Sequence, residues 1–83
     1  MSDPVSHRQL RRFWFPTIPG MGIGVTAATV DEARGLANSA LHPGMTITGM
    51  VTDVDVQSLD QDHVIPNMGP SAVRGVWFPR LNI

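Results

Sequence analysis

The fold is decided between residues 22 and 41, which read GIGVTAATVDEARGLANSAL. Apolar and small residues alternate from Gly22 to Ala27, and this period of two predicts a strand. Thr29 and Glu32 then have the spacing of a capping box, in which each side chain accepts a hydrogen bond from a backbone N–H at the start of a helix. The stretch therefore predicts a strand followed closely by a helix.

The predicted helix spans residues 30–41 and has one apolar face. Its apolar stripe at helical spacing consists largely of alanines, which predicts that the helix docks closely on a sheet. His42, Pro43 and Gly44 end the helix, because proline cannot continue the helical hydrogen bonds and glycine accepts the backbone of a helix end.

A second strand is predicted at residues 11–15, before this unit. Phe13 and Phe15 lie on one face and Trp14 on the other, and Pro16 ends the strand because proline has no N–H to donate to a neighbouring strand. The strand that follows runs back beside it as a hairpin with a wide loop.

A third strand is predicted at residues 46–56, where the period-two pattern separates a dry side from a wet side. The dry face carries three apolar side chains and the wet face two carboxylates: Met50, Val54 and Val56 against Asp53 and Asp55.

Every aromatic residue of the chain lies in one of two short segments, FWFP at residues 13–16 and VWFP at residues 76–79. The second segment belongs to a final strand predicted at residues 73–78. Aromatic rings confined to two strands of a small core are expected to come together, because each ring has a large apolar surface to bury. We therefore expect the first and last strands to be neighbours, with Phe15 close to Phe78.

These elements predict an α+β fold in two layers, with one helix packed on a largely antiparallel sheet of about four strands. The order is strand, strand, helix, strand, long loop, strand. A chain of 83 residues is long enough for a single core, which we place at residues 10–83, after a flexible N-terminal arm at residues 1–9.

Composition excludes several classes of function. The absence of cysteine excludes disulfides, thiol catalysis and thiolate metal sites, and the six basic residues are all arginine, which excludes lysine chemistry. A formal net charge of -1 provides no long-range field that would attract a polyanion. No segment is long and apolar enough for a signal peptide or a membrane span, so we expect a cytoplasmic protein that does not contact a membrane.

One group of side chains could hold a metal ion. Asp60, Asp62 and His63 combine oxygen and imidazole ligands and would suit a small metal-dependent hydrolase, but their spacing matches no calcium loop or other known metal site. The alternative is that they cap local turns in contact with solvent.

A basic run at Arg8, Arg11 and Arg12 precedes Phe13 and Trp14. Arginines beside aromatic rings can hold single-stranded nucleic acid through charge and stacking. The slightly negative net charge favours a solvated strand start instead, so nucleic acid is not the expected partner.

The segment at residues 57–72 is unusually long for a loop in a compact domain, and such loops are often functional. Its apolar residues argue against disorder. We place a recognition surface on this loop and just after it, with four candidate binding residues: His63, Asn67, Met68 and Arg74. The alternative is a structural crossover that closes an edge of the sheet.

Much of the chain past residue 12 resembles small bacterial proteins of no assigned activity, a resemblance that implies no chemistry. The segments that carry it are FWF at 13–15, GVTA at 24–27, DEA at 31–33, DQDHVIPNMG at 60–69 and VRGVWFP at 73–79. A shorter part, with Pro19-Gly20, GVTAAT at 24–29 and DEA at 31–33, resembles the strand-turn-helix start of HicB-type antitoxins. Those proteins neutralise a small ribonuclease toxin by binding it, so this resemblance implies a protein partner.

We therefore expect a small cytoplasmic protein-binding module, an inhibitor or an immunity or antitoxin-like accessory protein that acts by occlusion. Exposed sheet edges beside the long loop could pair with a strand of the partner, and a homodimer would use the same edges. The metal-dependent hydrolase and the nucleic-acid-binding protein stay open as alternatives. The sequence does not decide whether the protein is an enzyme, but it favours a protein without enzymatic activity that needs no cofactor.

Overall fold

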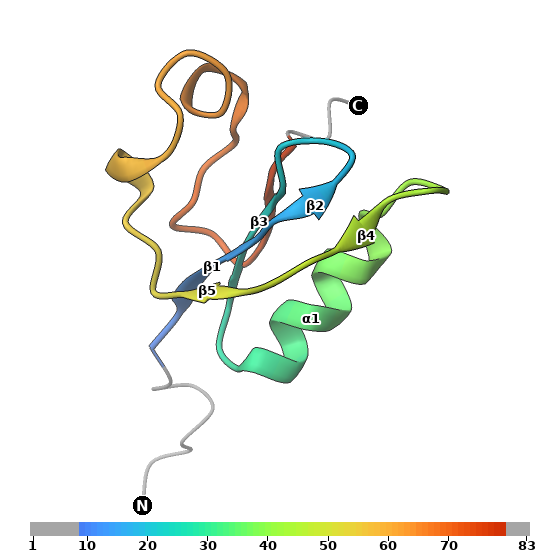
Figure 1. The fold of residues 1–83 in the computed structure, drawn as a ribbon. Helices are drawn as coiled ribbons and strands as arrows, with labels where there is room; N and C mark the ends of the chain where they lie inside the picture. Colours follow the sequence, from blue (N-terminus) through green and yellow to red (C-terminus); the bar gives the residue numbers. More distant parts are fainter. Residues whose placement is uncertain (1–8, 80–83) are drawn as a thin grey trace, which may run out of the picture.

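The structure is a computed structural model that describes residues 9–79 (Figure 1). One α-helix in this range, α1 (Val30–Ser39), packs on a four-stranded sheet in the order β5-β1-β3-β6. All three pairings in this sheet are antiparallel. The predicted α+β class is thus confirmed. The strands of the sheet are β1 (Arg11–Phe15), β3 (Ile23–Ala27), β5 (Val51–Thr52) and β6 (Gly75–Phe78).

The predicted hairpin of β1 and β3 forms the centre of the sheet. Its register pairs Phe13 with Val25 and Phe15 with Ile23, and all four side chains are buried on the face that α1 covers. The predicted N-terminal arm lies outside the described residues except for Gln9.

Helix α1 begins at the predicted cap. The N–H of Glu32 donates to Thr29 Oγ1 (3.1 Å), and the N–H of Ala28 donates to Glu32 Oε1 (2.9 Å). The glutamate therefore caps the residue before Thr29 and not Thr29 itself. Ala33 and Ala37 are fully buried in the core below the helix, as the alanine stripe predicts, and the helix ends at Ser39, two residues earlier than expected.

The aromatic rings divide between the two faces of the sheet. Phe13 and Phe15 lie under α1, with ring centroids 6.4 Å apart. The Trp14 ring lies on the opposite face, with its centroid 6.0 Å from that of Trp77 and 5.5 Å from that of Phe78. The rings of the two segments thus meet, but only on one face.

The prediction that the first and last strands are neighbours is wrong, because β3 lies between β1 and β6. Phe15 and Phe78 consequently belong to different clusters, one on each side of the sheet. A bulge in β6 contributes to this division. Gly24 pairs with Phe78 and Val25 with Val76, so Trp77 is an extra residue, and it shares a cluster with its neighbour Phe78 where strict alternation would separate them.

The long loop covers the face of the sheet opposite α1 (Figure 1, yellow to orange). It contains two short 3₁₀ helices, η1 (Val56–Ser58) and η2 (Ile65–Asn67). The N–H of Gly69 donates to the carbonyl oxygen of Trp77 (2.7 Å). The hydroxyl of Thr26 donates to the carbonyl oxygen of Ser71. The loop is therefore a packed layer of the fold. Val64 of the loop belongs to the tryptophan cluster itself, and the side chains packed against this cluster come from the loop and from the residues just before it: Val54, Val56, Leu59 and Met68.

The strand predicted at residues 46–56 is interrupted. Its first part, β4 (Thr46–Ile47), pairs with β2 (Thr17–Ile18) in a second, two-stranded sheet, and its second part is β5. Between them the N–H of Thr48 donates to the carbonyl oxygen of Pro16 (2.8 Å). Residues 46–52 thus run beside residues 13–18, and the regular strand pairing is interrupted between β4 and β5.

The predicted faces of this segment are also wrong. Met50 packs against the core on the helix side, whereas Val54 and Val56 pack against the tryptophan cluster on the other side. Between them Asp53 has left-handed backbone, with a φ of 54°, which turns the chain out of the sheet and ends the alternation.

Candidate binding site

The structure brings together two of the four predicted binding residues. Asn67 Nδ2 donates to the carbonyl oxygen of His63 (2.7 Å), so both belong to one turn of the loop. The His63 side chain is 69% exposed, and its Nδ1 lies 3.0 Å from Asp60 Oδ2. Met68 is partly buried against the tryptophan cluster. Arg74 contacts a different element, with its Nε 3.1 Å from Glu32 Oε2 at the start of α1.

The group proposed as a metal site forms a local turn. Asp60 Oδ1 accepts hydrogen bonds from the backbone N–H groups of Asp62 (2.8 Å) and His63 (3.0 Å). The bond from Asp62, and next the contact with the His63 side chain, lower the pKa of the Asp60 carboxyl. Within residues 9–79, no group of three or more His, Cys, Asp or Glu side chains is placed to hold a metal ion. The geometry is that of a capped turn.

The rings needed for a nucleic-acid site are covered. Phe13 is fully buried and Trp14 is 9% exposed, so neither ring offers a face on which a base can stack. Arg11 is engaged by a carboxylate, and Arg8 lies outside the described residues.

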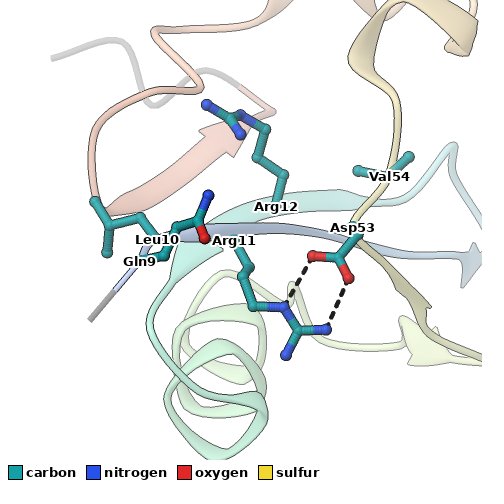
Figure 2. A pocket seen from close by; sticks show the side chains of 6 residues that line it. All are labelled: Gln9, Leu10, Arg11, Arg12, Asp53 and Val54. Atoms are coloured by element: carbon teal, nitrogen blue, oxygen red, sulfur yellow. Dashed lines mark hydrogen bonds and ion pairs between the residues drawn. The ribbon is translucent and has the colours of Figure 1, made fainter. Parts of the chain in front are cut away.

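A pocket of about 310 Å³ lies where β1 begins and the chain after β5 turns away (Figure 2). Two segments that are far apart in the sequence build its wall: Gln9, Leu10, Arg11 and Arg12 with Asp53 and Val54.

Arg11 and Asp53 form one side of this pocket. The guanidinium binds the carboxylate through two hydrogen bonds, from Nε to Oδ1 (2.8 Å) and from Nη2 to Oδ2 (2.9 Å). The hydrogen bond from Arg11 lowers the pKa of the Asp53 carboxyl, and Asp53 raises the pKa of Arg11. Arg11 Cζ also lies 5.4 Å from the centre of the Phe13 ring. Arg11 therefore connects the start of β1 to the end of β5.

Arg12 is placed differently. Its side chain extends away from the Arg11–Asp53 pair in Figure 2, as the alternation of a strand requires. None of the carboxylates between residues 9 and 79 forms an ion pair with it, although it is partly buried. Its carbonyl oxygen accepts a hydrogen bond from the N–H of Val54 (3.1 Å), which holds the two walls of the pocket together.

Beside the pocket runs an edge of the sheet, at residues 46–52, which read TITGMVT. The backbone partners of this segment within the described part of the chain all lie on one side, in residues 13–18. Most of its residues are exposed, and Val51 is 45% exposed. The segment contains neither a charged residue nor a proline.

Sequence reasoning did not find this site. It placed the basic run at the start of a strand and Asp53 on the wet face of another, but it did not pair the two strands. The residues of the ion pair are 42 positions apart, and only the pairing of β1 with β5 joins them.

Comparison with protein-family models, with curated proteins and with solved structures finds no match for this chain. In the described range, no helix has the length and apolarity needed to cross a membrane. The function must therefore be inferred from the geometry of the chain itself.

Proposed function

We propose that this protein is a binding module that takes up an extended segment of another protein as an additional strand along residues 46–52. It acts by occlusion, as an inhibitor or an antitoxin-like accessory protein does, and forms no covalent bond with its partner. Strand addition obtains affinity from main-chain hydrogen bonds and specificity from side chains that alternate along the strand.

The observation that carries the proposal is the unprotected edge. An open strand edge can pair with any other chain, and proteins usually blunt such edges with charges, proline, bulges or a covering segment. Residues 46–52 have no charge and no proline, and no segment among residues 9–79 pairs with their outer side. Their threonines and valine also favour strand pairing.

The opposite edge of the sheet is less suitable. A bulge at Trp77 distorts β6. The carbonyl oxygen of Trp77 already accepts a hydrogen bond from Gly69, and Pro79 follows the strand directly. Bulges, prolines and covering segments are among the devices that protect an edge. β4 and β5 are short, with two residues each, but residues 46–52 have none of these three, so we favour this edge as the site for a partner strand.

Selection of 12-residue peptides from a random displayed library on the immobilised full-length protein tests the proposal. Selected peptides should shift the backbone amide resonances of residues 46–52 in the ¹⁵N-labelled protein. Val51→Asp should weaken their binding about tenfold, because aspartate disfavours strand structure and adds a charge to the edge.

Val73→Asp is the matched control, because Val73 is 59% exposed and shortly precedes β6, the strand at the opposite edge of the sheet. It should leave peptide affinity unchanged. Enrichment of no peptide, or shifts confined to the turn at His63 and Asn67, would contradict the proposal. A concentration-dependent dimer that Val51→Asp abolishes would instead assign the edge to a second copy of the chain.

A further inference from the structure

We propose that Arg12 binds a carboxylate of the partner, so that the strand taken up along residues 46–52 is acidic at the end that reaches the pocket. This inference rests on the proposed function, and it identifies the chemistry of the partner.

The position of the pocket carries the first step. β5 ends at Thr52, and the left-handed backbone of Asp53 directs the chain out of the sheet. The N–H of Val54 still donates to the carbonyl oxygen of Arg12, so residues 53 and 54 remain beside the start of β1. A partner strand that pairs with β5 and continues past Thr52 therefore reaches the pocket that Asp53 and Val54 line together with Arg12.

The two arginines of the pocket carry the second step. Arg11 already makes two hydrogen bonds to Asp53, so its charge is matched within the chain. The guanidinium of Arg12 has no carboxylate partner in residues 9–79, and the aliphatic side chains of Leu10 and Val54 line the same pocket. A guanidinium presents parallel N–H groups that fit the two oxygens of a carboxylate.

A protein carboxylate fits this pocket better than a nucleic acid does. A backbone of phosphates needs a row of cations. Among residues 9–79, Arg12 is the one cation lining the pocket that has no carboxylate partner, and the neighbouring rings of Phe13 and Trp14 are buried. The adjacent open edge offers main-chain hydrogen bonds that suit a peptide.

A second copy of this chain that pairs antiparallel about the middle of the edge does not supply the carboxylate. In an antiparallel pairing of two copies centred on residues 49 and 50, Met45 and Thr46 of the second copy lie opposite residues 53 and 54. Neither residue is acidic. A pairing shifted to centre on Asp53 places two carboxylates together and is disfavoured.

The test repeats the peptide selection on the full-length wild type, on Arg12→Gln and on Arg34→Gln. Arg34 is the matched control, because it is exposed on α1 and also has no ion pair in the described residues. Peptides selected on the wild type and on Arg34→Gln should carry Asp or Glu at one fixed position. Those selected on Arg12→Gln should lose this preference.

One selected peptide and its twin, with Gln in place of the acid, are then titrated. The twin should bind the wild type about tenfold more weakly, and the two should bind Arg12→Gln equally, as a double-mutant cycle requires. Arg12→Lys keeps the charge but loses the paired N–H groups. The difference in affinity between the two peptides should therefore be smaller on Arg12→Lys than on the wild type, and larger than on Arg12→Gln. Even if the Arg12 variants fold poorly, the affinities of the two peptides for the wild type show whether the partner's carboxylate contributes to binding.

The outcomes separate the two proposals. Peptides that shift residues 46–52 but bind equally well with Glu or Gln would overturn the role of Arg12 and leave strand addition standing. Peptides that shift no resonance of residues 46–52 would overturn both. Tighter binding through Arg12 of a decauridylate, or of a phosphoserine version of the peptide, would overturn the carboxylate in favour of a phosphate.

Discussion

The Trp77 ring lies so close to Gly24 that a β-carbon on this glycine would overlap the indole. Gly24 is the residue of β3 at which the bulge of β6 begins, and the bulge places Trp77 on the face opposite α1. Gly22 has the same relation to the Trp14 ring. The second face of the sheet is thus built around two missing side chains, and two tryptophans fill the space.

Gly24→Ala should therefore destabilise the protein, by about 1–3 kcal/mol for an overpacked site. The new methyl group must displace the Trp77 ring, which is 1% exposed and has no room to move without disturbing its cluster. Urea unfolding followed by circular dichroism measures the change. Gly35→Ala is the control, because a methyl group at this position of α1 meets nothing within 4 Å. It should raise the free energy of unfolding by about 1 kcal/mol, since alanine has a higher helix propensity than glycine. Equal effects of the two substitutions would contradict the close contact.

Trp77→Ala should cost about 3–5 kcal/mol, because it leaves a cavity in the cluster between the sheet and the long loop. The indole Nε1 is buried without a hydrogen-bond partner in the described part of the chain. Trp77→Phe keeps a ring and removes this unsatisfied donor, so it should cost clearly less than the alanine substitution. Denaturant midpoints of both variants provide the comparison. An alanine variant as stable as the wild type would show that the ring is not buried.

Thr29→Ala should cost about 1 kcal/mol through the loss of the helix cap. The hydroxyl accepts the N–H of Glu32, which has no other acceptor at the first turn of α1. Thr29→Ser retains an oxygen at the same place and should restore most of the stability. The melting temperature, measured by circular dichroism, distinguishes the three proteins. If serine and alanine are equally destabilising, the cap is not the cause.

Acid should weaken the Arg11–Asp53 pair in a predictable direction. The pKa of Asp53 is lowered in the folded protein, chiefly by the hydrogen bond from Arg11, so the stability from this pair is present above about pH 4 and is lost as the pH falls through the lower folded value. Asp53→Asn should lose less stability than the wild type over this acidic range. Arg11→Gln should behave in the same way, since it removes the cause of the shift. Urea midpoints across the acidic range measure this dependence, and parallel curves for all three proteins would exclude it.

Local patterns were sufficient for the central elements, β1, β3 and α1. The capping residues Thr29 and Glu32 placed the start of α1 correctly, and the alternation before them placed β3 and its hairpin with β1. These signals act over a few residues, because a cap or a period of two is a property of a short stretch of chain. The α+β class follows from them.

What the local pattern could not supply is the place of each strand in the sheet. β1 and β6 carry matching aromatic segments, yet β3 separates them, since β5 and not β6 pairs with the open side of β1. The turn at Asp53 and the bulge at Trp77 then decide which face receives Met50, Val54 and the two tryptophans. One residue of bulge or turn reverses every face that follows it, and alternation alone does not show where this happens.

The candidate site depends on the same long-range pairing. The sequence by itself determined that an arginine run opens one strand, that Asp53 lies on the wet face of another, and that residues 46–52 contain no charge. Only the tertiary structure decided that these features share one edge, that Asp53 binds Arg11, and that Arg12 is left beside the pocket. The physical reason is that strand pairing joins residues through hydrogen bonds that do not depend on side-chain identity, so the partner of a strand is chosen by the packing of the whole core.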